Sequence, residues 1–156
     1  MKKILFITFL IGISTISFAQ KKFAYQVECI SVENEGYVTI KIWNTKLGKK
    51  YTQEQARKDA IHAILYSGVP NTNGCFTQKP LLSNSDAEEN FGKIEKDFFS
   101  KKGSWSKYTR DAKTETTLPV NIGDKSWKVY QVSVSKNELR KYLEEQKIIK
   151  SLNNGF

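Results

Sequence analysis

A short hydrophobic segment at the N-terminus is the feature that most constrains this chain, because it indicates in which compartment the chain folds and which residues remain in the mature domain. Two lysines precede an apolar run over residues 4–16, and the small-residue pattern Ser-Phe-Ala follows at 17–19. This pattern is typical of a secretory signal peptide cleaved after Ala19. The run is shorter than the roughly 20 apolar residues that a membrane-spanning helix needs. We therefore expect export to the periplasm, loss of the signal peptide at 1–19, and one domain over 20–156.

Export would place the two cysteines, Cys29 and Cys75, in an oxidising compartment. A single disulfide between them is the simplest arrangement, and two buried free thiols are the alternative. On the chain-entropy model, closing a loop of about 45 residues would stabilise the fold by roughly 4 kcal/mol. One histidine and two cysteines exclude a multi-histidine metal site, a four-cysteine zinc site and an iron–sulfur cluster. No cofactor is expected.

The periodicity of the apolar residues predicts an α+β domain. Alternating residues at 23–32 and 37–43 indicate a hairpin, with Cys29 pointing inward. Capping boxes, in which a hydroxyl side chain is followed three residues later by Glu or Gln, mark three helix starts. The expected elements are strands at 23–32 and 37–43, helices at 52–66 and 85–101, strands at 116–122 and 127–134, and a helix from 135 towards 153. This ββααββα order indicates an antiparallel sheet of about four strands with helices packed on one face.

The sequence also indicates how the helix at 52–66 packs and how the polar stretches at 70–84 and 104–115 are held. The helix at 52–66 carries alanines at 56, 60 and 63, so its axis is expected to lie close to the sheet. The polar stretch 70–84 contains Cys75, and we interpret it as a loop held by that cysteine rather than a domain linker. Residues 104–115 are interpreted as a loop or a short irregular strand.

A basic segment with aromatic residues is the one surface with a recognisable binding character. The formal net charge of the chain is +9, and the leader contains only two of the 25 basic residues, so the mature domain stays basic. Such a segment could hold an anionic or glycan partner, with cations for charge and an indole for stacking. The alternative is a solvated helix end followed by a loop whose aromatic residues pack into the core. The candidate residues are Lys101, Lys102, Trp105, Lys107, Tyr108 and Arg110.

Catalytic patterns are weak in this sequence. His62 falls on the polar side of its helix, near Lys58 and Asp59, and is expected to be a solvated surface residue. There is no Gly-x-Ser-x-Gly pattern and no glycine-rich phosphate loop. Acid–base chemistry by two carboxylates stays open, although none of the acids stands in a distinctive context. The candidate acids are Glu28, Glu33, Glu35, Asp86, Glu88, Glu89, Glu95, Asp97 and Glu115.

One stretch resembles a known family. Residues 56–68, Ala-Arg-Lys-Asp-Ala-Ile-His-Ala-Ile-Leu-Tyr-Ser-Gly, resemble the alanine-spaced helix of small secreted domains of the flagellar-assembly-T-like kind. The C-terminal part, 130–134 with the following helix and 151–156, is similar to other exported bacterial proteins. The resemblance implies an envelope-associated α+β module without known catalysis, and it supplies no catalytic residues. Many such domains are lipid-anchored, whereas this chain has no cysteine near Ala19, and the 70–84 loop has no counterpart there.

These observations favour a non-enzymatic envelope module that binds a protein partner or an anionic envelope polymer. A small secreted hydrolase that uses carboxylates on glycan or cell-wall substrates is the alternative. A carrier that encloses a lipid-like ligand between sheet and helices is a third reading. Nucleic acid would use the same cations and rings, but an exported protein rarely meets it.

Overall fold

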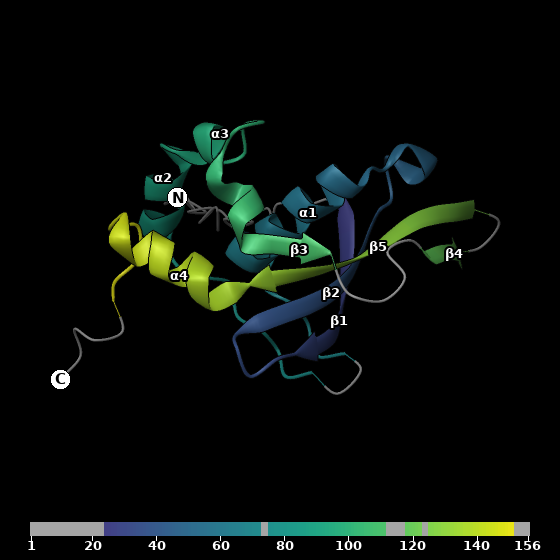
Figure 1. Cartoon of the computed structure of the whole chain (residues 1–156), viewed down its shortest axis with the longest axis horizontal. Coiled ribbons are helices and arrows are strands. Elements are labelled where there is room, and N and C mark those ends of the chain that lie inside the picture. Colours follow the sequence, from purple (N-terminus) through teal and green to yellow (C-terminus); the bar gives the residue numbers. More distant parts are fainter. Residues whose placement is uncertain (1–23, 73–74, 112–117, 123–124, 152–156) are drawn as a thin grey trace, which may run out of the picture.

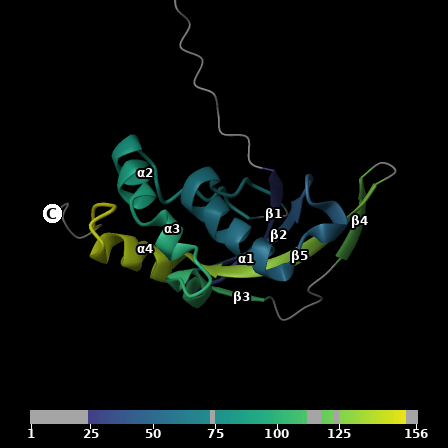
Figure 2. The same cartoon turned by 90° about the horizontal axis from the view of Figure 1, so that it is seen from above.

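The computed structural model describes residues 24–72, 75–111, 118–122 and 125–151. Its fold is α+β, as predicted: helices lie along one side of an antiparallel sheet (Figures 1 and 2). Some predictions fall outside the described residues. They are the leader and its cleavage site, the expected strand start at Phe23 and the acid Glu115.

Five strands form the sheet, and β2 and β5 are central. The strands are β1 (Tyr25–Val32), β2 (Tyr37–Asn44), β3 (Thr109–Asp111), β4 (Leu118–Ile122) and β5 (Lys125–Ser135). The order across the sheet is β1-β2-β5-β3, and β4 also pairs with β5. Val129 of β5 pairs with Trp43 on one side and Leu118 on the other, so β3 and β4 share one edge of β5. The sheet is therefore four strands wide, and Pro119 lies in an edge strand, where a missing amide hydrogen is tolerated.

The helix α1 (Gln53–His62) packs on β2 and β5 through its small residues. Ala56, Ala60 and Ala63 are fully buried, which brings the helix axis close to the sheet. The Thr52 hydroxyl accepts the Gln55 amide, as the capping box predicts. The other half of the box does not form, because the Gln55 side chain donates to Asp59 instead.

The helix predicted at 52–66 does not stay α-helical to its end. Residues Ala63–Ser67 form a π-helical turn, η2, in which the Gly68 amide donates to the Ala63 carbonyl, five residues back. The wider turn frees the carbonyls of Ile64 and Leu65, which accept the amides of Leu81 and Leu82. Amide donors from a segment distant in the sequence thus replace the missing donors of the helix.

The helix predicted at 85–101 is two short helices, α2 (Ser85–Gly92) and α3 (Glu95–Phe98). Aromatic packing explains the break. The ring centroids of Phe91 and Phe98 are 5.3 Å apart, whereas seven residues of straight helix would separate them by about 10 Å along the axis. The start of α2 also differs from the prediction, because Asn84 rather than Ser85 caps it and accepts the Ala87 amide.

The last helix, α4 (Lys136–Glu145), also departs from the prediction at both ends. Ser135 makes no side-chain capping bond; the Lys136 amide donates to the Gly36 carbonyl of the β1–β2 turn. At the other end, the Lys147 amide donates to the Glu144 carbonyl and the Ile148 amide to the Leu143 carbonyl. This is a Schellman motif, which ends the helix before residue 148.

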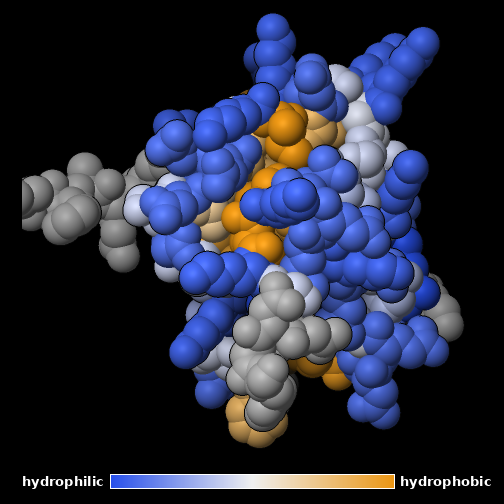
Figure 3. All heavy atoms as spheres, turned by 90° about the vertical axis from the view of Figure 1, so that its left-hand side faces the viewer, coloured by the Kyte–Doolittle hydropathy of each residue, from blue (hydrophilic) through white to orange (hydrophobic). Residues whose placement is uncertain are grey.

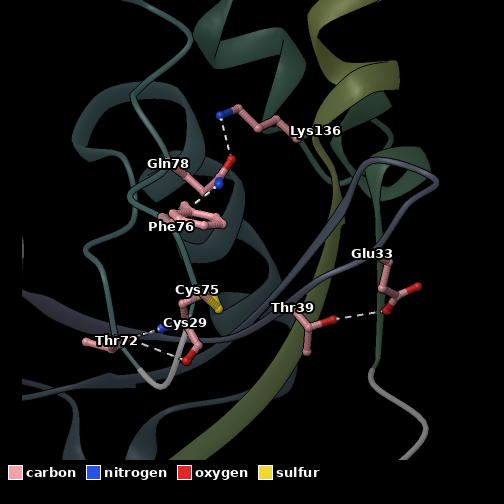
Figure 4. Close-up of a disulfide and its surroundings, with 8 residues drawn as sticks. All are labelled: Cys29, Glu33, Thr39, Thr72, Cys75, Phe76, Gln78 and Lys136. Atoms are coloured by element: carbon pink, nitrogen blue, oxygen red, sulfur yellow. Dashed lines mark hydrogen bonds between the residues drawn. A yellow bond between two sulfur atoms is a disulfide. The ribbon is translucent and has the colours of Figure 1, made fainter.

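The expected disulfide between Cys29 and Cys75 is present, with their Cα atoms 6.1 Å apart (Figure 4). It holds the segment after Gly68 against β1, the first edge strand. Thr72 adds a second contact there: the Cys29 amide donates to its Oγ1 at 2.7 Å, and its hydroxyl donates to the Cys29 carbonyl at 3.4 Å. The base of this segment is closed by a bridge between Val69 and Gln78. The 70–84 stretch is therefore a loop held by Cys75, as predicted.

Candidate functional site

The aromatic residues of the basic segment belong to the core. Trp105, in the 3-10 turn η3 (Ser104–Tyr108), is buried, and its indole N–H donates to the Ser100 carbonyl at 2.9 Å. Tyr108 is half-buried and stacks on Phe98, with ring centroids 6.1 Å apart. The predicted stacking surface for a glycan or an anion is therefore not formed by these rings, and the packed alternative describes them correctly.

Arg110 is engaged elsewhere. Its guanidinium pairs with Glu33 at 3.1 Å and lies 3.9 Å from the ring centroid of Tyr37. Both contacts tie β3 to the β1–β2 hairpin. Arg110 therefore stabilises the sheet, whereas the lysines of the segment do not.

The remaining lysines of the segment are exposed and gain cationic neighbours from α1. The ammonium of Lys58 lies 5.0 Å from the Trp105 ring centroid, and the guanidinium of Arg57 lies 5.4 Å from it. The charges of Lys58, Lys101 and Arg57 lower the pKa of the Glu54 carboxyl, with the Lys58 ion pair as the largest cause. We call the set Lys101, Lys102 and Lys107 the cationic face. Lys58 is not part of it, because it is half-buried and its ammonium pairs with Glu54 at 3.0 Å.

Arg57 has a structural role that the sequence did not reveal. Its Nε donates to Thr109 Oγ1 at 2.8 Å, and its Nη2 donates to the carbonyls of Thr109 at 2.9 Å and Ser106 at 3.2 Å. These bonds hold β3 and η3 against α1. A planar guanidinium with five donors suits such a multiple contact, whereas a lysine could not reproduce it.

His62 is not the solvated residue that the helical wheel predicts. It is half-buried; its Nδ1 lies 2.9 Å from the Tyr25 hydroxyl, and its ring packs against Tyr66 at 4.5 Å between centroids. The Tyr25 hydroxyl also lies 2.9 Å from Ser67 Oγ. Burial raises the pKa of Tyr25, so this phenol is neutral and the chain of contacts serves as a packed polar cluster.

Asp59 is the functional-looking residue that the sequence reasoning missed. It is 9 % exposed, and its carboxylate accepts from Gln55 at 2.7 Å, Tyr51 at 2.9 Å and Asn44 at 3.4 Å. Burial raises the pKa of Asp59, although the three donors oppose the shift. Burial and the Asp59 charge raise the pKa of Tyr51 as well. The Gln-x-x-x-Asp spacing on α1 was the available signal, but Asn44 and Tyr51 could be placed only by the fold.

The described candidate acids show no facing pair. Glu28 pairs with Lys41 at 3.5 Å, Glu33 with Arg110, and Glu89 with Lys93 at 3.5 Å. Glu95 accepts the Tyr66 hydroxyl at 3.2 Å. Glu35, Asp86, Glu88 and Asp97 are exposed. Of these eight acids, Asp86 alone lines the open groove between α2 and the end of α4. The hydrolase alternative therefore gains no support from these acids.

An open groove of about 850 Å³ lies between α2 and the end of α4. Figure 3 shows this end of the molecule, with a strip of apolar atoms between hydrophilic flanks. One wall is formed by residues 79–90 and the other by residues 140–151. Sequence reasoning did not find it, because the two walls lie far apart in the chain.

Within residues 24–151, apart from the undescribed gaps, no group of three or more His, Cys, Asp and Glu side chains could hold a metal ion. In the same residues, no helix combines the length and apolar character needed to cross a membrane. Comparison with known proteins adds no relative: no family model, no curated protein and no solved structure matches this chain.

Proposed function

We propose that this protein is a non-enzymatic module of the bacterial cell envelope that binds an anionic envelope polymer through the cationic face. The carrying observation is that Trp105 and Tyr108 pack into the core while Lys101, Lys102 and Lys107 of the same segment stay exposed. The leader pattern supports a periplasmic location, and the Cys29–Cys75 disulfide is compatible with an oxidising compartment.

Binding at this face depends on charge rather than on stacking. Trp105 and Tyr108 are turned into the core, so the lysine ammonium groups are what the segment offers to a ligand. Attraction between exposed charges is screened within about 8 Å at physiological ionic strength. The proposed interaction is therefore sensitive to salt and tolerant of the polymer's detailed structure, as suits a repeating polyanion.

Co-sedimentation of the purified protein with isolated cell-wall sacculi tests this proposal. A variant with Lys101→Glu, Lys102→Glu and Lys107→Glu should lose at least about tenfold in affinity, because three attractive charges become repulsive. The matched control is Lys46→Glu, Lys49→Glu and Lys50→Glu, which makes the same charge change at three exposed positions around the 3-10 turn η1 (Gly48–Lys50). Equal losses in both variants would show that net charge acts without a defined face.

Two further readouts separate the parts of the proposal. Mass spectrometry of the periplasmic fraction should find a chain that begins at residue 20, and an intact leader on a cytoplasmic chain would contradict export. Incubation with sacculi should release no soluble fragments. Release that survives in the Lys-to-Glu face variant would instead favour the hydrolase alternative.

A further inference from the structure

The groove between α2 and α4 has apolar residues at its base and exposed lysine side chains on its rim. Leu81 and Ile148 are buried at the base, and Ile149 is half-buried beside them. Serine, asparagine and aspartate side chains line the α2 wall, and Ser151 lies on the other wall. The groove therefore offers aliphatic contact and hydrogen-bonding groups together.

The charge of the groove is predominantly positive. Arg140 and Glu144 face each other at 3.7 Å and largely neutralise one another. This leaves Lys79, Lys147 and Lys150 against the single carboxylate of Asp86 among the described lining residues. A surface with three cations and one anion favours an acidic occupant.

Another cation stands behind the Lys79 wall. The ammonium of Lys136 donates to the Gln78 side-chain oxygen at 3.1 Å (Figure 4). It also donates to the Lys79 carbonyl at 3.2 Å. Both acceptors are neutral, so its charge is not cancelled by these contacts. Burial, and to a smaller extent the charge of Arg140, lower the pKa of Lys136, which stands at the start of α4 and not among the residues that line the groove.

The backbone at Lys147 is unusual in a way that points to its side chain. Lys147 occupies the position after the helix cap in the Schellman motif, with φ +56°. Glycine is the common residue there, because a side chain in left-handed backbone is strained. A lysine is thus kept at a position that favours glycine, and it lines the groove. Backbone strain of this kind is often found where a side chain has a function.

We propose that the groove binds an extended acidic segment of a partner protein. Aliphatic side chains of the segment rest on Ile148 and Ile149, and its carboxylates meet Lys79, Lys147 and Lys150. A peptide backbone requires both donors and acceptors. The Ser83 hydroxyl can act as either, and the side-chain amide nitrogens of Asn84 and Asn90 can donate, while the oxygens of these two amides accept from Ala87 and Lys93. No aromatic residue is among the described lining residues, which disfavours a sugar, and the open, mixed lining disfavours an acyl chain. This site does not use the cationic face, so either proposal can fail alone.

Fluorescence anisotropy with a labelled peptide of eight alternating leucine and glutamate residues tests the groove. The variant Lys147→Gly removes the charge and relieves the backbone strain together. We expect its affinity for the peptide to fall about fivefold while its unfolding temperature rises by about 3 °C. A merely structural lysine would not give opposite changes in binding and stability. Lys147→Asn, which also tolerates this backbone, should weaken binding to the same extent.

The controls identify the occupant. Lys49→Ser, which removes an exposed lysine in η1, should leave peptide affinity unchanged. A leucine–lysine peptide should not bind, and a serine–glutamate peptide should bind several-fold more weakly. The proposal is overturned if Lys147→Gly binds like the wild type, or if the leucine–glutamate peptide fails to bind at about 1 mM. Groove-dependent binding of phosphatidylglycerol vesicles without peptide binding would assign the groove to a lipid instead. Peptide binding that requires removal of residues 152–156 would assign it to the chain's own C-terminus.

Discussion

The two edges of the sheet are closed by different chemistry. On β1, the Cys29–Cys75 disulfide holds a loop in place, and Thr72 bonds to both backbone groups of Cys29. On β3, Arg57 of α1 bonds to the hydroxyl and carbonyl of Thr109. An open strand edge is a template for pairing with another chain, so both closures protect against aggregation. The first depends on oxidation, whereas the second forms in any redox state.

This difference separates the functions of the two closures. The β1 closure is covalent, but it joins only a loop to the sheet, so it restricts the movement of that loop. The β3 closure is non-covalent but joins the principal helix to the sheet, and its guanidinium also lies over Trp105. Loss of the β1 closure is therefore expected to act mainly through the unfolded state, whereas loss of the β3 closure acts on the folded packing.

Removing the disulfide should have the largest effect on stability. Cys29→Ser combined with Cys75→Ser opens a loop with a sequence separation of 46. On the chain-entropy model, the free energy of unfolding should fall by about 4 kcal/mol. Urea unfolding of this variant measures the change, and wild-type protein in reductant serves as the control. A loss below about 1 kcal/mol would show that the bridge adds little to the β1 closure.

Removing Arg57 should have the second largest effect, and it should not depend on reductant. Arg57→Ala leaves the Thr109 and Ser106 carbonyls without their donor and uncovers Trp105, so we expect a loss of about 2–3 kcal/mol. Arg57→Lys keeps the charge but not the planar fork, and should recover less than half of the loss. Full recovery by lysine in urea unfolding would mean that charge alone closes the β3 edge.

Replacing Thr72 should have a smaller effect that depends on the disulfide. Thr72→Val keeps the shape but loses both bonds to Cys29, which should cost about 1 kcal/mol. In the variant without the disulfide, the same change should cost less, because the loop is already released. Urea unfolding of the four combinations gives the coupling. Additive losses would show that the hydrogen bonds of Thr72 to Cys29 form equally well without the disulfide.

The smallest effect should come from Asp59→Asn, and its distinguishing feature should be a change in the pH dependence of stability. The pKa of Asp59 is raised by burial, so protonation favours the folded state and the Asp59 contribution falls as pH rises from the unfolded to the folded pKa. The wild type should therefore lose stability relative to the Asn variant as pH increases above the unfolded pKa of the carboxyl. Parallel stability curves from pH 4 to 7 would refute it.

The sequence predicted the features that depend on local pattern. Period-two alternation located the hairpin, and two cysteines in a chain with a leader indicated the disulfide. Alanine spacing placed α1 close to the sheet. These predictions succeeded because neighbouring residues along one element determine which face is apolar.

The features missed by sequence reasoning depend on contacts between distant segments. Phe91 and Phe98 pack across a break that only Gly92, a poor helix former at the end of α2, indicates in the sequence. The helical wheel of His62 could not show Tyr25 beside it. The sequence pattern did not single out Arg57 or Asp59, because only the fold places Thr109 and Asn44 next to them. The basic segment left two readings open, and burial of Trp105 decided for packing.

The π-helical turn after α1 sets how far the chain would open in a reducing environment. Because Ile64 and Leu65 bind the amides of Leu81 and Leu82, both ends of the intervening loop are fixed by hydrogen bonds that need no sulfur chemistry. Reduction would then release the middle of the loop, around Thr72, while its two ends stay attached. In amide exchange, fast-exchanging positions would be confined to that middle, and those of residues 81 and 82 would remain slow.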